Sequence, residues 1–124
     1  MTRILIVEDE PRIAAFVSRG LEAAGYETLV VEDGPEGLEA ALRGDADLVL
    51  LDVGLPTMDG FEVLRELRAR GSAVPVIMLT ARSSTRDTVT GLDAGANDYV
   101  PKPIDTTELF MAIEPWLRTV RPRL

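Results

Sequence analysis

Acidic, hydroxyl and amine side chains directly follow four of the chain's five short apolar segments. In chain order they are Glu8, Asp9, Glu10, Asp52, Thr80 and Lys102. A carboxylate can act as a nucleophile toward phosphorus and form an acyl phosphate. Clustered carboxylates supply the oxygen ligands that Mg²⁺ prefers, and an ammonium and a hydroxyl stabilise charge on a transferring phosphoryl group. This set is therefore sufficient for Mg²⁺-assisted phosphoryl transfer to Asp52.

Each of these residues alone has a simpler explanation. An acid after a strand commonly stabilises the N-terminus of the next helix, and we assign that role to Glu10. A single Thr80 is most often a cap, a single Lys102 a solvated charge, and Asp52 by itself a turn residue. The chemical interpretation depends on coincidence, because every strand-like segment except the second is followed by a group useful for the same reaction.

Strand-like and helix-like patterns alternate along the chain. Strands are predicted over Arg3–Val7, Glu27–Val31, Asp47–Leu51, Pro75–Leu79 and Asp98–Val100. Helices are predicted over Glu10–Ala24, residues 34–43, a segment capped by Asp59, residues 84–94, and a segment from about Asp105 to Trp116. The apolar period of the first helix places on one face Ile13, Phe16, Val17, Gly20, Leu21 and Ala24.

Capping residues predict where several helices begin and end. Gly25 ends the first helix in a left-handed C-cap. Asp59 caps the third helix, and Asp105 or Thr106 caps the last one. Pro115 lies inside the last helix and removes one backbone hydrogen bond, so it predicts a kink or an early end.

Strict β–α alternation predicts an α/β fold with helices on both faces of a parallel sheet. Five strands fit a flavodoxin-like doubly wound sheet of order 2-1-3-4-5 in a single domain. In such sheets, sites form beyond the carboxyl ends of the strands, where the strand order reverses between the first and third. The domain is expected to span residues 1–118, with residues 119–124 as the start of a linker or C-terminal tail.

Composition limits the possible functions. The net charge of −8 argues against binding of nucleic acid by this domain itself. The absence of Cys and His excludes thiol and histidine chemistry and zinc sites built from these residues. No apolar run is long enough for a membrane helix and no signal peptide is visible, so we expect a cytoplasmic domain without membrane contact. Lys102 is the only lysine.

Four motifs occur in one order and spacing: ILIVEDE, LVLLDVGLPTMDGFEVL, PVIMLTA and GANDYVPKP. Together they resemble the receiver domains of response regulators in two-component signalling, over nearly the whole chain from Met1 to about Trp116. The chain looks most like receivers that are joined to winged-helix DNA-binding domains in transcription regulators. The resemblance implies a phosphoacceptor regulatory domain rather than an enzyme, catalysing only its own phosphorylation and slow dephosphorylation.

The resemblance also implies a role for each matching residue. Asp52 would accept a phosphoryl group from a sensor histidine kinase. Asp9, Asp52 and the backbone carbonyl of Gly54 would bind Mg²⁺, with Glu8 acting mainly through water. Lys102 would pair with phosphoryl oxygens.

Further roles concern the switch and the structure around the site. Thr80 would move to hydrogen-bond the phosphoryl group, and Tyr99 would swing inward behind it. Without the resemblance, Tyr99 would be interpreted as a half-buried aromatic residue that packs against its neighbours. The Lys102–Pro103 bond would be cis. Pro56 and Gly60 are taken as loop and cap residues.

Three positions depart from the common family pattern. Glu8 is longer than the aspartate usual at its place, and Gly54 lacks the side chain that often shapes access to the phosphoryl group. Arg82 lies at a second position that tunes phosphoryl lifetime in relatives. We expect these residues to alter rates rather than the type of reaction.

The output face is expected to be the fourth helix, fifth strand and fifth helix, through which similar receivers form homodimers. Asp98, Glu108 and Arg118 are the charges available there. Relatives usually place basic residues at Thr88 and Ala112, and an acid at Asn97.

Three alternatives remain in competition with the phosphorylation switch. The same fold suits a degenerate receiver that acts as a constitutive interaction module. It also suits a flavodoxin-like electron carrier, although acids at Glu8, Asp9 and Glu10 would repel a flavin phosphate. A metal-dependent phosphohydrolase would need a general acid where Pro11 stands. No P-loop motif occurs.

Overall fold

The computed structural model describes residues 1–81 and 95–117. Its strands are β1 (Arg3–Val7), β2 (Glu27–Val31), β3 (Leu48–Asp52), β4 (Val76–Thr80) and β5 (Asp98–Pro101), and its helices are α1 (Pro11–Ala23), α2 (Gly34–Leu42), α3 (Gly60–Ala69) and α5 (Thr106–Leu117). The helix expected over residues 84–94 and the tail from residue 118 lie outside the described residues.

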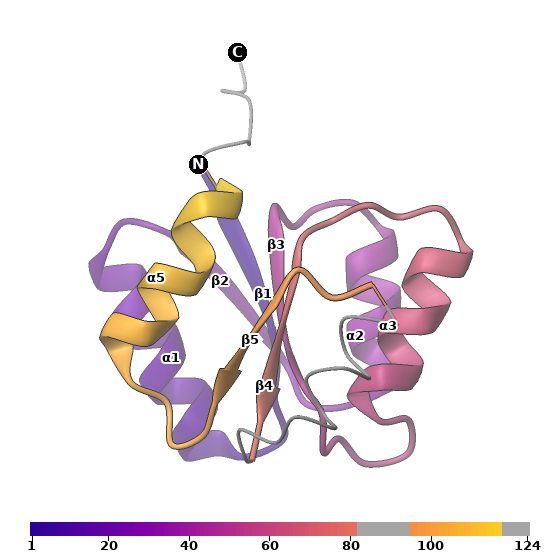
Figure 1. Cartoon of the computed structure of the whole chain (residues 1–124), viewed down its shortest axis with the longest axis horizontal. Coiled ribbons are helices and arrows are strands. Elements are labelled where there is room, and N and C mark those ends of the chain that lie inside the picture. Colours follow the sequence, from indigo (N-terminus) through magenta and orange to yellow (C-terminus); the bar gives the residue numbers. More distant parts are fainter. Residues whose placement is uncertain (82–94, 118–124) are drawn as a thin grey trace.

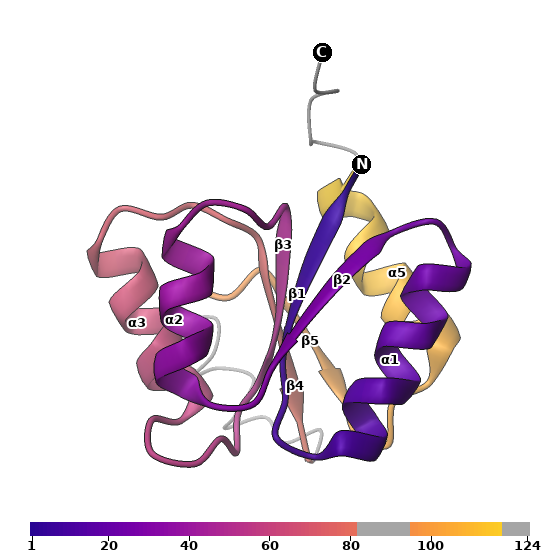
Figure 2. The same cartoon turned by 180° about the vertical axis from the view of Figure 1, so that it is seen from behind.

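All neighbouring strands pair in parallel, in the order β2-β1-β3-β4-β5. The predicted sheet is therefore confirmed. Helices α1 and α5 cover one face, and α2 and α3 cover the other (Figure 1, and Figure 2 from behind). All residues of β3 and β4 are buried, as apolar strands covered on both faces should be. None of the described helices is long and apolar enough to cross a membrane.

The two faces of the sheet form two apolar clusters. Alternate residues of one strand enter different clusters, since successive side chains point to opposite faces. Leu5 and Val7 of β1 pack with α2 and α3, whereas Ile4 and Ile6 pack with α1 and α5. Phe16 was expected on the buried face of α1, but this prediction is wrong because its side chain is 51% exposed. The buried stripe of α1 consists of Ala14, Val17 and Leu21.

Carboxylate side chains that precede helices cap their first turns. Asp59 accepts a hydrogen bond from the Glu62 N–H at 3.0 Å, and Asp105 accepts one from the Glu108 N–H at 3.1 Å. Gly25 has φ +95° immediately after the C-cap of α1. These predicted caps and ends are confirmed. Glu10 is the N-cap of α1, as assigned from the sequence.

Pro115 does not end α5, which continues to Leu117. The sequence predicted a kink or an early end here; the early end is wrong, and the kink stays a prediction. Pro115 is exposed, and so is Met111 one turn earlier, at 70%. Water can therefore solvate the Met111 carbonyl that a residue with an N–H at position 115 would have bonded.

Strands β3 and β4 begin and end one residue later than predicted. Asp47 stays outside β3 and accepts a hydrogen bond from the Arg3 N–H at 2.9 Å through its side chain. Asp52 and Thr80 are consequently the last residues of β3 and β4, held in the sheet opposite Leu79 and Pro101 respectively. The sheet itself therefore positions both polar residues.

Gly60 begins α3 directly against the backbone of Asp52. A Cβ atom at this position would overlap the Asp52 carbonyl oxygen and lie 2.9 Å from its carbonyl carbon. The Gly60 N–H also donates to the Val53 carbonyl at 3.0 Å. The sequence identified Gly60 only as a loop and cap residue, whereas the structure requires it for close packing of α3 on the end of β3.

Arg68 of α3 ties this helix to the chain that leads into β5. Its guanidinium donates to the carbonyls of Gly95 and Ser72 at 3.0 to 3.1 Å and to Asn97 Oδ1 at 3.2 Å. The same Asn97 oxygen accepts from the Val76 N–H at 2.9 Å. Helix α3, the start of β4 and the start of β5 therefore meet at one side chain.

We predict opposite effects of the same substitution at two glycines. Gly60→Ala should destabilise the domain by roughly 1–3 kcal/mol, because overpacking forces a backbone shift. Gly20→Ala lies within α1 with nothing within 4 Å of the added carbon, and should stabilise by about 0.5–1 kcal/mol. Urea unfolding of both variants measures the difference, and equal stability of the two would contradict the packing argument.

We also predict that Arg68→Met lowers the free energy of unfolding by roughly 1–3 kcal/mol, since it leaves partly buried carbonyls without a donor. Arg65→Met is the matched control, because Arg65 is exposed on the same helix and its loss should change stability by less than about 0.5 kcal/mol. Thermal or urea unfolding provides the comparison. A loss no larger than that of the control would show that the clamp contributes nothing.

Candidate functional site

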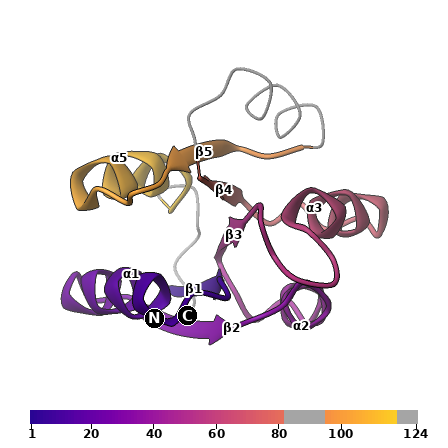
Figure 3. The same cartoon turned by 90° about the horizontal axis from the view of Figure 1, so that it is seen from below.

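The carboxyl ends of four parallel strands bring the candidate residues to one edge of the sheet, which we call the carboxyl edge. Figure 3 looks onto this edge. Glu8 and Asp9 follow β1, and the other candidates are Asp52 at the end of β3, Thr80 at the end of β4 and Lys102 after β5. Because β1 pairs with β3 and β4 pairs with both β3 and β5, Asp52 lies centrally among them.

Lys102 makes two ion pairs at this edge. Its Nζ lies 2.7 Å from Glu8 Oε1 and 2.9 Å from Asp52 Oδ1. The side chain of Glu8 is fully buried and that of Asp52 nearly so, while that of Lys102 is 17% exposed. A hydrogen bond from the Lys102 N–H to the Thr80 carbonyl ties the start of this segment to β4. The ammonium therefore joins residues from the ends of β1 and β3.

Glu8 is an unusual buried carboxylate. Its Oε2 accepts a hydrogen bond from the Glu10 N–H at 3.1 Å. Its Oε1 accepts no well-aligned hydrogen bond within the described residues, although it contacts the ammonium. Burial raises the pKa of Glu8 above its usual value; Lys102 and the Glu10 N–H oppose this rise, and the charge of Asp52 adds to it.

Lys102 responds in the complementary way. Burial by itself lowers its pKa, but the close contacts with Glu8 and Asp52 and the charges of both carboxylates outweigh burial. The net effect raises the pKa of Lys102 above its usual value. Lys102 is therefore a protonated ammonium at neutral pH, held by the two acids.

The acidic residues fit a divalent cation. Carboxylate oxygens of Glu8, Asp9 and Asp52 all lie within 4.8 Å of one another. Lys102 offsets one of these three negative charges, which leaves two uncompensated at the carboxyl edge. The carboxylate oxygens of this cluster are of the hard type that Mg²⁺ prefers.

The loop after β3 places no side chain beside one carboxylate oxygen of Asp52. Gly54 is exposed, and a Cβ on it would lie 3.8 Å from Asp52 Oδ2. Beyond it, the Met58 N–H donates to the Pro56 carbonyl at 2.7 Å, across Thr57 with φ +70°. A non-glycine residue with a positive φ is strained, and such residues occur preferentially at functional sites. The sequence contained no sign of it, because Thr is a poor choice for a positive φ.

The remaining candidates fall into place around this centre. Thr80 is buried at the end of β4. Tyr99 is half-buried on β5 and packs against the cluster under α2 and α3, as the packing interpretation expects; its movement stays a prediction. The Lys102–Pro103 peptide is cis, as predicted. Arg82 lies outside the described residues.

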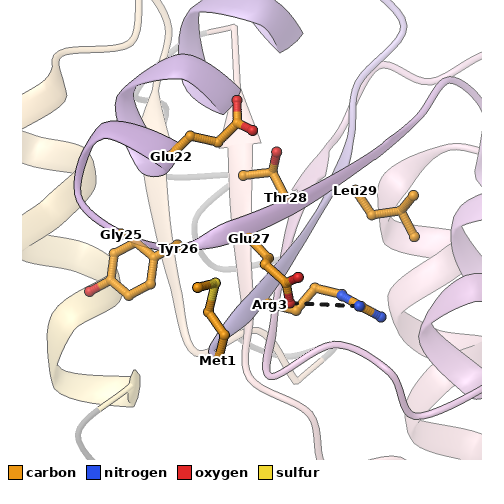
Figure 4. A pocket seen from close by; sticks show the side chains of 8 residues that line it. All are labelled: Met1, Arg3, Glu22, Gly25, Tyr26, Glu27, Thr28 and Leu29. Atoms are coloured by element: carbon orange, nitrogen blue, oxygen red, sulfur yellow. Dashed lines mark ion pairs between the residues drawn. The ribbon is translucent and has the colours of Figure 1, made fainter.

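One pocket lies away from the carboxyl edge. It has a volume of about 650 Å³ and lies at the other end of the sheet (Figure 4). Its lining residues are Met1, Arg3, Glu22, Gly25, Tyr26, Glu27, Thr28 and Leu29. The exposed pair of Arg3 and Glu27, 3.6 Å apart, crosses it. Since it lies at the start of β1 and β2, it takes no part in the carboxyl edge.

Comparison with known proteins identifies the class to which this fold and site belong. Residues 4–114 match the family model of the response regulator receiver domain. The chain therefore belongs to the receiver domains of two-component response regulators. It is a regulatory domain, and the flavodoxin-like carrier and phosphohydrolase alternatives are not favoured.

Individual relatives agree with this assignment. The chain is 55% identical over 115 residues to the transcriptional regulatory protein YkoG of Bacillus subtilis, covering 93% of this chain and 50% of YkoG. The Francisella response regulator 1452 receiver domain superposes with a TM-score of 0.90 at 32% identity, over 97% of this chain and 100% of that one. The chain thus spans about half the length of the curated relatives it matches.

A third relative carries a metal. The receiver domain of sensor histidine kinase PA1611 from Pseudomonas aeruginosa, with a magnesium ion coordinated in its active site cleft, superposes with a TM-score of 0.87. It is 36% identical, over 95% of this chain and 98% of that one. In this chain, Glu8, Asp9 and Asp52 form an acidic cluster at the carboxyl edge.

We predict that Lys102→Met destabilises the apo domain by on the order of 3 kcal/mol, because it leaves buried carboxylates without their counter-charge. Adding Glu8→Gln to this variant should recover part of the loss. Arg43→Met, which breaks the exposed pair with Glu39, should cost less than about 0.5 kcal/mol. Urea unfolding in EDTA, so that no divalent cation compensates, makes the measurement; additive effects of the two site substitutions would refute the coupling.

Proposed function

We propose that this domain is a phosphorylation-activated switch in which Asp52 accepts a phosphoryl group from a sensor histidine kinase. The observation that carries the proposal is the environment of Asp52: a buried carboxylate with an ammonium at 2.9 Å and two further acids beside it. A carboxylate without a reaction to perform would seldom be buried among like charges, because their repulsion costs stability. A constitutive interaction module would not need this arrangement.

The transfer forms one bond and breaks another. A carboxylate oxygen of Asp52 bonds to phosphorus, and the bond from phosphorus to the donor nitrogen breaks with its electron pair remaining on the donor imidazole. Lys102 neutralises charge on the phosphoryl oxygens, and Thr80 donates a hydrogen bond to one of them. We expect the open side at Gly54 to admit the donor and, later, water for slow dephosphorylation.

Mg²⁺ is the cofactor that we propose for this step. Asp9, Asp52 and the backbone carbonyl of Gly54 would hold it, with Glu8 close by. When bound, the ion would stabilise charge on the phosphoryl oxygens. The support is the acidic cluster with two uncompensated charges and the magnesium-bound receiver domain to which this chain is similar.

The consequence of phosphorylation would be a shift between two conformers of the face made by the fourth helix, β5 and α5. Thr80 and Tyr99 would carry the change from Asp52 to this face. Because relatives of about twice the length are transcriptional regulators, we infer that the controlled output is transcription. We also infer that the domain works in the cytoplasm, where the ATP that charges a histidine kinase is found.

We further propose that this face forms a homodimer in the phosphorylated state. On the described part of it, Glu108 and Met111 of α5 are exposed, and Asp98 is partly exposed. Ala112 is buried, so its side chain is not exposed on this face. Thr88 and Arg118 lie outside the described residues. We also propose that the receiver domain spans residues 1–118 and that a linker begins at residues 119–124.

We predict that acetyl phosphate with Mg²⁺ adds the mass of one phosphoryl group to the chain, and that Asp52→Asn abolishes the adduct. Asp45→Asn, an exposed aspartate away from the carboxyl edge, should label like the wild type. Intact mass spectrometry with and without EDTA reads the result. Equal labelling of wild type and Asp52→Asn would overturn the assignment of Asp52, and no labelling under any metal condition would favour a degenerate receiver.

A further inference from the structure

The two anchors of Lys102 differ in what else they do. Asp52 holds the ammonium through Oδ1 at 2.9 Å, and its Oδ2 lies on the open side toward Gly54. Glu8 holds the same ammonium more closely, at 2.7 Å, from a side chain with no exposed surface. The phosphoacceptor thus has an oxygen left for another ligand, and the nearer anchor is the residue that solvent does not reach.

Both oxygens of Glu8 are already engaged. Oε1 contacts the Lys102 ammonium, and Oε2 accepts from the Glu10 N–H at 3.1 Å. Asp9 differs, because its exposed side chain makes no hydrogen bond or ion pair within the described residues. Of the two acids that follow β1, Asp9 is therefore the one available to a cation without breaking an existing contact.

The charges divide in the same way. Glu8 and Lys102 form one neutral pair inside the carboxyl edge. Asp9 and Asp52 then carry the two uncompensated negative charges, which match one divalent cation. A cation that recruited Glu8 as well would have to separate a buried ion pair, and a buried charge without its partner is strongly disfavoured.

We propose that Glu8 is a positioning residue for Lys102 and not a ligand of the cation. This inference rests on the proposed function of Asp52 as phosphoacceptor. When the cation takes an oxygen of Asp52, Glu8 keeps the ammonium at the site, where a phosphoryl oxygen will arrive. It gives Glu8 a second role beside the action on Mg²⁺ through water that the resemblance implies.

The length and the two oxygens of Glu8 both matter. An aspartate would withdraw its carboxylate by about one carbon–carbon bond, away from Lys102. A glutamine has the right length but a single acceptor oxygen, and its amide nitrogen is a donor. It can satisfy the Glu10 N–H or contact Lys102, but not both. Glu8→Asp and Glu8→Gln therefore remove the anchor in different ways.

The chain offers a direct test because Lys102 is its only lysine. Isotopic labelling of lysine gives one side-chain nitrogen signal, and an ion-paired ammonium is protected from rapid proton exchange with water. We expect this protected signal in the apo wild type and also at saturating Mg²⁺. In Glu8→Gln and Glu8→Asp it should disappear on addition of Mg²⁺, since Asp52 is then the only anchor and a cation bound at its other oxygen neutralises the charge that holds the ammonium.

Glu32→Gln is the matched control, because Glu32 is an exposed acid after β2 at the same edge, and it should behave as the wild type. Loss of the protected signal in Mg²⁺-saturated wild type, or its survival in both Glu8 variants, would overturn the proposal. Backbone spectra of each variant establish folding and metal saturation. Failure of the proposed function is seen separately, as absence of the Asp52 adduct by mass, whatever the lysine signal does.

Discussion

The site depends on placing three carboxylates and one ammonium at the same edge of a sheet without unfolding it. Like charges this close repel, and burial of Glu8 and Asp52 removes the water that would screen them. Lys102 makes the arrangement tolerable by contacting both acids at 2.7 and 2.9 Å. What remains is a partly compensated cluster, stable enough to fold and still negative enough to attract a cation.

That balance requires strand ends that do not move. Asp52 belongs to the last register position of β3, and Gly60 lets α3 press directly on its backbone. At the other end of the sheet, Arg68 joins α3 to the starts of β4 and β5. The same helix therefore supports β3 near the site and the two following strands at a distance from it, which keeps the strand ends in one spatial relation.

Around this rigid frame, the open features lie on one side. Gly54 places no side chain beside Asp52 Oδ2, and the strained turn at Thr57 lies just beyond it. Lys102 contacts the other carboxylate oxygen, Oδ1, and is also held by Glu8, whose side chain has no exposed surface. In the proposed switch, this asymmetry would give the phosphodonor and water one shared approach to Asp52.

Local patterns in the sequence were enough for the order of elements, the caps and the set of polar residues after the strands. Strand alternation, a capping acid such as Asp59 and a glycine such as Gly25 act over a few residues, so their effect can be read without the fold. The partner of Glu8, the exposure of Phe16, the need for Gly60 and the clamp at Arg68 depend on segments distant in sequence. Only the tertiary structure decides these, because contact between such segments follows from how the sheet packs its helices, and no local period encodes it.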